Sequence, residues 1–147
     1  MAKAKTGDIL EQRLGYLLQR AASAAMASLG ARLAQLELRQ VDASVLMLID
    51  EEPSIIASRI GRTLGIHGAN MVPLMRALEE RELIVRKPLD KKSHGLHLTD
   101  KGTETLAEVR AILDQFEEDL ESLIPARRRT ATAESLRAIW RAHDTRE

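Results

Sequence analysis

Cysteine is absent from this 147-residue sequence, so disulfide bonds, thiol catalysis and thiol-based peroxide sensing are excluded. Aromatic residues are nearly absent: Phe, Trp and Tyr occur once each, and the core must therefore be built from aliphatic side chains. No stretch approaches the roughly 20 apolar residues that a membrane helix needs, and the start of the chain lacks the apolar segment of a signal peptide. We expect a cytoplasmic protein of about one domain, without membrane contact.

The patterns that mark enzymes and metal sites are also scarce. The sequence contains no glycine-rich phosphate-binding loop and no Cys–His or Ser–His–Asp arrangement that would support nucleophilic catalysis. His94 and His97 are separated by two residues, but no cysteine accompanies them, and solvated or phosphate-facing histidines are the simpler interpretation. We therefore predict neither an enzyme nor a bound cofactor, and we assign no metal ligands.

Positive and negative charges cancel over the whole chain but are unevenly distributed. Residues 54–101 contain nine Lys or Arg against five Asp or Glu, a net charge of +4, whereas residues 103–124 contain one Arg against seven Asp or Glu, a net charge of −6. Such a molecule would attract phosphate at one end and be repelled from it at the other. The arginines at 127–129 are expected to complement a helix end or the acidic segment rather than to bind DNA.

Residues 54–80 follow the pattern of two short helices joined by a turn. Ser54 is a good N-cap for the first helix, and Gly65 is expected to end it because glycine adopts left-handed φ without steric cost. Pro73 is tolerated only in the first turn of a helix, so the second helix should begin near Asn70, with Asn70 or Gly68 as its cap. Two short helices joined by a glycine-containing turn predict a helix-turn-helix. The apolar face of the second helix consists of Met71, Leu74, Met75 and Leu78.

A basic hairpin is predicted directly after the second helix. Residues 83–85 are apolar and β-branched, which favours a strand, and residues 96–98 alternate as expected of its antiparallel partner. The loop between them contains four Lys or Arg. A helix-turn-helix followed by a charged hairpin predicts a winged helix-turn-helix, with one helix in the DNA major groove and the loop against the backbone or minor groove.

Helices are also predicted on both sides of this unit. Residues 8–36 carry apolar side chains three or four positions apart, and Asp42 is a plausible N-cap for a short helix that ends near Pro53. Thr99 is expected to cap a helix over residues 100–124, followed by Pro125 and a final short amphipathic helix. The apolar residues of the long C-terminal helix form a heptad seam. The seam could pack on the first helix of its own chain, but a strict seam on a long helix more often pairs with a helix of a dimer partner. Its residues are Leu106, Val109, Leu113, Phe116, Leu120 and Leu123.

This order of elements, together with several short motifs, resembles the MarR family of bacterial transcriptional regulators. The motifs are Leu64-Gly65-Ile66, Leu78-Glu79 with Leu83-Ile84, Asp90-x-Lys92, and Leu96-x-Leu98-Thr99-x-x-Gly102. The resemblance covers nearly the whole chain. It implies a mainly α fold with a small β-hairpin wing (α+β), and an obligate homodimer that binds palindromic DNA.

We accordingly expect three segments within one structural unit. Residues 1–40 would form an N-terminal dimerisation helix, residues 41–99 the winged helix-turn-helix DNA-binding domain, and residues 100–147 the C-terminal dimerisation helices.

Charge and resemblance together define the residues expected to contact double-stranded DNA. Asn70 would bind a base edge or a phosphate, whereas the arginines and wing lysines would neutralise phosphates. Lys92 stands where the family usually has arginine, which keeps the charge but loses the bidentate fork. The small residues at the helix tip predict few base contacts, so specificity would depend partly on DNA shape. The candidates are Ser54, Arg59, Arg62, His67, Gly68, Ala69, Asn70, Arg76, Asp90, Lys91, Lys92 and His94.

The resemblance also implies regulation by a small molecule. We expect a repressor whose aromatic or anionic effector binds between the dimer helices and the winged domain and changes the spacing of the two DNA-reading helices. Tyr16 and Phe116 are the aromatic residues of the two long helices and the candidate walls of this site, although a core role is the simpler interpretation. Two alternatives stay open: a metal-responsive regulator of the same fold, and a helical dimeric interaction module that has lost DNA binding.

Overall fold

The computed structural model describes residues 7–144, which form a mainly helical fold with one two-stranded antiparallel sheet, as predicted. In chain order the elements are α1 (Asp8–Glu11), α2 (Leu14–Leu33), the 3₁₀ helix η1 (Ala34–Leu36), α3 (Gln40–Glu51), α4 (Ala57–Leu64), α5 (Gly68–Glu80), β1 (Ile84–Pro88), β2 (His94–Leu98), α6 (Asp100–Ser122), the 3₁₀ helix η2 (Ala126–Arg128) and α7 (Arg129–His143).

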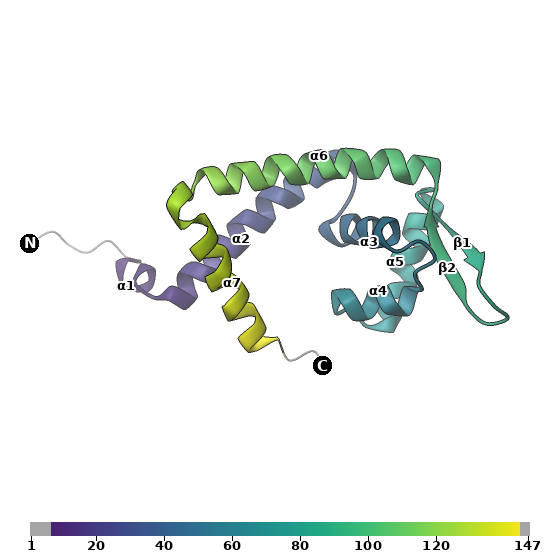
Figure 1. Ribbon diagram of the computed structural model, residues 1–147, viewed down its shortest axis with the longest axis horizontal. Coiled ribbons are helices and arrows are strands. Elements are labelled where there is room, and N and C mark those ends of the chain that lie inside the picture. The colour runs from purple at the N-terminus through teal and green to yellow at the C-terminus, as the bar shows by residue number, and fades with distance from the viewer. Residues whose placement is uncertain (1–6, 145–147) are drawn as a thin grey trace, which may run out of the picture.

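The elements are arranged at the two ends of the long helix α6 (Figure 1). Helices α3, α4 and α5 and the β1–β2 hairpin gather around the N-terminal end of α6 and form the winged domain. Helices α1 and α7 and the first half of α2 lie toward its C-terminal end. Helix α2 packs along α6 and connects the two ends of the molecule.

The core is aliphatic, as the composition predicted. It is centred in the winged domain and continues along the contact of α6 with α2 and α3. Phe116, on α6, is the one aromatic side chain buried in it. The largest fully buried side chains are Leu33, Leu46, Ile49, Ile60, Met75, Leu78, Leu83, Leu96, Leu106, Val45 and Val109.

The long helix predicted over residues 8–36 is interrupted at both ends, so this prediction was wrong in its bounds. Arg13 has an extended backbone (φ −93°, ψ 116°) and separates α1 from α2. At the other end, α2 tightens into η1, and Glu37 adopts the left-handed conformation (φ 54°). The chain then turns back, and Leu38 is buried in the core.

Asp42 was predicted to be an N-cap, but it lies inside the first turn of α3. The helix begins at Gln40 with Arg39 at the N-cap, and Asp42 Oδ2 accepts a hydrogen bond of 2.7 Å from the Arg39 backbone N–H. The carboxylate therefore caps the helix from its third position, where negative charge also complements the helix dipole.

Thr99 caps α6 as predicted, because its Oγ1 accepts a hydrogen bond of 2.9 Å from Gly102 N. The predicted seam of α6, however, packs mostly within its own chain. Leu106, Val109 and Phe116 are buried where α6 meets α2 and α3. Only the distal end of the seam is open, since Leu123 is 80% exposed.

The last helix, α7, buries none of its fifteen residues against the described part of the chain. It follows Pro125 and η2, and Arg129 lies at its start. Arg129 Nε donates to the carbonyl oxygens of Glu121 (3.0 Å) and Ile124 (3.1 Å) at the end of α6. This confirms for Arg129 the prediction that the arginine run complements a helix end.

Candidate DNA-binding surface

The turn between α4 and α5 has the predicted helix-turn-helix geometry. Gly65 ends α4 with φ 67°, a left-handed conformation that glycine adopts without strain. The next amide, Ile66 N, donates to Gly61 O (2.8 Å) and directs the chain back toward the body of the domain. A Cβ on Gly61 would lie 3.1 Å from Ile66 O and 3.2 Å from the Met71 side chain, so the two helices approach closely here.

Ser54 does not cap α4, and this prediction was wrong. The N-cap of α4 is Ile56, whereas Ser54 has φ 76° and lies in a turn before it. Its backbone N–H donates to Leu96 O (3.1 Å), its hydroxyl lies 3.0 Å from His97 Nε2, and Ile55 forms a β-bridge with Leu96. The segment therefore pairs with β2 instead of starting a helix.

Helix α5 begins at Gly68, two residues earlier than predicted, with the backbone of His67 at the N-cap. Neither Gly68 nor Asn70 is the N-cap, and the structure shows no side-chain cap at this end. Pro73 consequently lies within the helix rather than in its first turn. The predicted tip is nevertheless present: His67, Gly68, Ala69 and Asn70 are consecutive and exposed.

The predicted phosphate-binding arginines lie on the two helices of the motif. Arg62 and Arg76 are exposed. Arg62 lines a groove of about 590 Å³ together with His67 and Gly68, so it lies close to the helix tip. Arg59 is also exposed, but its guanidinium forms an ion pair of 3.0 Å with Glu52. An exposed pair of this kind contributes only about 0.2–1 kcal/mol and can be replaced by a phosphate contact.

The wing loop is organised by Asp90. Its Oδ1 accepts hydrogen bonds from the backbone N–H groups of Lys92 and Ser93, both 2.8 Å, and its Oδ2 accepts one of 2.6 Å from the Ser93 hydroxyl. These bonds, first of all that of the Ser93 hydroxyl, lower the pKa of Asp90. Asp90 thus fixes the loop backbone, whereas Lys91 and Lys92 extend from it as exposed side chains.

The hairpin confirms the predicted antiparallel pairing, but the predicted bounds were wrong. Strand β1 extends to Pro88 and β2 begins at His94, so the loop comprises residues 89–93 instead of 86–95. Ile84 pairs with Leu98, and Pro88 pairs with His94 at the distal end, where His94 is exposed. Sequence reasoning missed an ion pair between Arg86 of β1 and Glu79 of α5, which links the wing to the recognition helix. It also missed Ser93, although an Asp followed by Ser three positions later is a recognisable turn signal.

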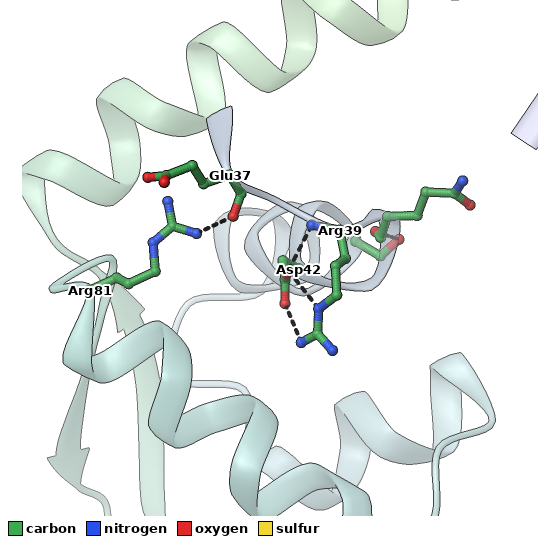
Figure 2. Close-up of polar contacts among 6 residues, drawn as sticks. Glu37, Arg39, Asp42 and Arg81 are labelled. Carbon is green, nitrogen blue, oxygen red and sulfur yellow. Dashed lines mark hydrogen bonds and ion pairs between the residues drawn. The ribbon is translucent and has the colours of Figure 1, made fainter. Parts of the chain in front are cut away.

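A crevice of about 680 Å³ lies behind α5, between this helix and the segment that connects α2 to α3. Arg81 Nη1 donates to the carbonyl oxygen of Glu37 (2.6 Å), and Arg39 Nε and Nη2 donate to Asp42 (Figure 2). Arg81 Nη2 also donates to the carbonyl oxygen of Leu36 (3.0 Å). These two guanidinium groups give the crevice a polar rim. The remaining lining residues are Asn70, Pro73, Leu74, Ala77 and Leu78.

The two aromatic candidates for an effector site are not brought together. Phe116 is buried and lines a cavity of about 420 Å³ between α2 and α6, to which Tyr16 does not contribute. The guanidinium of Arg32 lies 5.6 Å from the centroid of the Phe116 ring and pairs with Asp119 at 2.5 Å. Phe116 therefore acts as a core residue with one accessible edge, and Tyr16 is half-buried elsewhere on α2.

Residues 7–144 contain neither a cluster of three His, Asp or Glu side chains that could hold a metal ion nor a helix both long and apolar enough to span a bilayer.

Comparisons with known proteins agree with this geometry. Residues 38–94 match the model of the MarR family. The transcriptional repressor CouR, in a structure bound to a 23-mer DNA duplex, is 35% identical, with 93% of this chain and 99% of that chain covered and a TM-score of 0.82. CouR bound to p-coumaroyl-CoA gives 33% identity, coverage of 96% and 99%, and a TM-score of 0.80.

The chain belongs to the MarR family. It is a winged helix-turn-helix transcriptional regulator that binds DNA, and not an enzyme. A putative transcriptional regulatory protein for the hcr operon of Thauera aromatica is 24% identical over 99 residues, which are 66% of this chain and 60% of that protein. The chain thus spans less than two thirds of this relative's length.

Proposed function

We propose that this MarR-family protein is a cytoplasmic, homodimeric repressor that binds a palindromic DNA site and leaves it when a small anionic effector binds. The observation that carries the proposal is the exposed surface formed by the tip of α5 and the wing. It occurs on a fold that matches a repressor bound to DNA with a TM-score of 0.82. In the dimer, two α5 helices about 34 Å apart would enter successive major grooves on one face of the duplex.

The homodimer is supported by apolar surface at the end of the molecule away from the winged domain. Helix α7 buries no side chain against the described part of the chain, yet Trp140 is 58% exposed and Leu136 is 49% exposed on it. Further apolar side chains are exposed on α1 and α2: Ile9, Leu10, Leu14 and Leu17. A contiguous apolar surface of this kind indicates a protein interface. A second copy of the chain is its occupant in this proposal, so residues 1–40 and 100–147 would form the dimerisation region around residues 41–99.

The effector site in this proposal is the crevice between α5 and the α2–α3 connection. An occupant would contact the DNA-reading helix on one side, at Asn70 and Ala77, and the long-helix framework on the other, at Glu37 and Arg39. It could therefore favour one relative placement of the two parts, which is the requirement for ligand control of DNA binding. The guanidinium side chain of Arg39 is 67% exposed and provides positive charge for an anion.

The test is DNA binding with and without ligand. A duplex selected from a random pool by the purified protein would be labelled, and its dissociation constant measured with p-coumaroyl-CoA, p-coumarate or coenzyme A present. We expect p-coumaroyl-CoA, which is the ligand in one CouR structure, to weaken DNA binding at least tenfold. Failure to enrich any sequence would contradict repression, and unchanged affinity with all three compounds would contradict the proposed effector class.

The Arg39→Gln variant tests the proposed effector site independently of DNA binding. This variant should bind the selected duplex as the wild type does but require several-fold more thioester for release. Arg110→Gln is a matched control, because Arg110 is likewise exposed and paired with an aspartate, Asp50 at 2.6 Å, and does not line the crevice. Equal effector responses in both variants would place the effector elsewhere.

A further inference from the structure

The recognition helix presents an outward face that is mostly apolar. Its buried side chains lie at positions 71, 74, 75 and 78, and a second set, two positions earlier in each case, is exposed. Two residues correspond to about 200° around an α-helix, so this second set faces away from the core. It consists of Ala69, Val72, Pro73 and Arg76.

Val72 lies at the centre of this outward face and is 60% exposed. Its side chain, like those of Ala69 and Pro73, contains no hydrogen-bond donor or acceptor. Arg76, one turn further along, is the charged member of the set, and Pro73 and Asn70 lie toward the side of the helix that borders the crevice. Apart from Arg76, this face cannot bind a base edge through paired hydrogen bonds in the way that arginine binds guanine or asparagine binds adenine.

One base in the major groove offers an apolar partner to such a face. Thymine carries a 5-methyl group there, whereas guanine, adenine and cytosine present only donors and acceptors. A branched aliphatic side chain at the centre of the face can bury this methyl group. The small side chain of the neighbour Ala69 leaves room for the groove edge to approach.

We propose that Val72 recognises the 5-methyl group of one thymine in each half of the DNA site. This inference rests on the proposed function, because it requires that α5 enters the major groove. It identifies a specificity-determining residue with no polar group of its own. Burial of one methyl group corresponds to about a fourfold gain in affinity, and the two halves of a palindrome together correspond to about fifteenfold.

The experiment replaces thymine by deoxyuridine, which removes only the methyl group. A duplex selected from a random pool by the wild-type protein would be resynthesised with uracil at each symmetric pair of thymines in turn. Fluorescence anisotropy would then give the dissociation constants. We expect one pair of positions at which uracil weakens wild-type binding about fifteenfold. The Val72→Ala variant should bind the thymine and uracil duplexes within about twofold of each other.

Val85→Ala is the matched control, since Val85 is also an exposed valine (40%) but lies on β1 of the wing. This variant should retain the full preference for thymine. The proposal is overturned if the wild type binds every uracil duplex as well as the thymine duplex, or if Val72→Ala keeps the preference, which would then arise from DNA shape. If no sequence is enriched at all, the proposed function fails first and this inference with it.

Discussion

At the scale of single residues, two glycines of the winged region differ in what surrounds them. Gly102 lies in the first turn of α6, and a Cβ there would overlap the carbonyl oxygen of Leu83. Gly68 begins α5, and a Cβ there would meet no atom within 4 Å. The first glycine is therefore required by the packing of α6 against Leu83, the residue before β1, and the second glycine is not required by packing.

Gly102→Ala should lower the free energy of unfolding by about 3 kcal/mol, because backbone must move to remove the overlap. Gly68→Ala is the control and should change it by less than about 1 kcal/mol, in the stabilising direction, because alanine is the better helix former. Urea denaturation would measure both, at one fixed protein concentration because the proposed dimerisation would contribute to apparent stability. Equal midpoints for the two variants would contradict the packing argument.

Two exposed residues of the candidate surface are expected to have different roles in DNA binding. Lys92 extends from the wing and would contact phosphate, so Lys92→Ala should weaken binding to selected and random duplexes by the same factor. Asn70 lies at the helix tip, so Asn70→Ala should change the ranking among sequences. Competition binding with a panel of single-base variants of the selected duplex would measure this. Uniform losses from both substitutions would refute this assignment of roles.

At the scale of elements, the wing depends on the charge of one carboxylate. The pKa of Asp90 is lowered in the folded loop, so the folded value lies below that of the unfolded chain, about 4. The stabilisation of the loop is therefore complete above about pH 4 and is lost as the pH falls through the folded value.

Hydrogen exchange of the amides of Lys92 and Ser93, followed by NMR spectroscopy, would test this dependence. In the wild type, the protection factor should be constant from neutral pH to about pH 4 and then decrease as Asp90 is protonated. Asp90→Ala should remove the protection at every pH, whereas Lys91→Ala, in the same loop, should leave it unchanged. Protection that survives in Asp90→Ala would show that the loop is held by other contacts.

Structural features that are determined by residues close together in the sequence could be predicted. Features that depend on contacts between residues far apart in the sequence could not. Gly65, Thr99 and the hairpin are local signals, and the structure confirms them. Ser54 also has the local signature of a cap, but its amide instead pairs with Leu96 across the sheet. The pattern of residues 50–60 gives no sign of this contact, because the partner lies about forty residues later in the chain.

The same distinction applies to the candidate site. The exposed tip and the wing lysines followed from composition and order, because solvent-exposed positions are set by the local helix and hairpin pattern. Arg81, by contrast, donates to carbonyl groups more than forty residues earlier in the chain. The crevice that it borders could be found only from the folded structure.

At the scale of the whole molecule, the heptad seam of α6 shows why a sequence pattern does not by itself identify a dimer surface. A strict seam indicates a partner helix but does not specify which one. Here the partners over most of the seam are α2 and α3 of the same chain. The uncovered apolar surface is instead on α7 and the first half of α2, with Trp140 and Leu136 among its exposed residues.

The salt dependence of DNA binding would test the dimer and the DNA surface together. Five candidate cations per protomer would give about ten phosphate contacts per dimer: Arg59, Arg62, Arg76, Lys91 and Lys92. A plot of the logarithm of the binding constant against the logarithm of the salt concentration should then have a slope of about −9.

The double variant Leu136→Asp, Trp140→Asp should be monomeric by light scattering, because it places charge in the proposed interface. Its slope should then be about half the wild-type value. A monomer that retained the full slope would show that one winged domain makes all the phosphate contacts, and a dimer that survived both substitutions would place the interface away from α7.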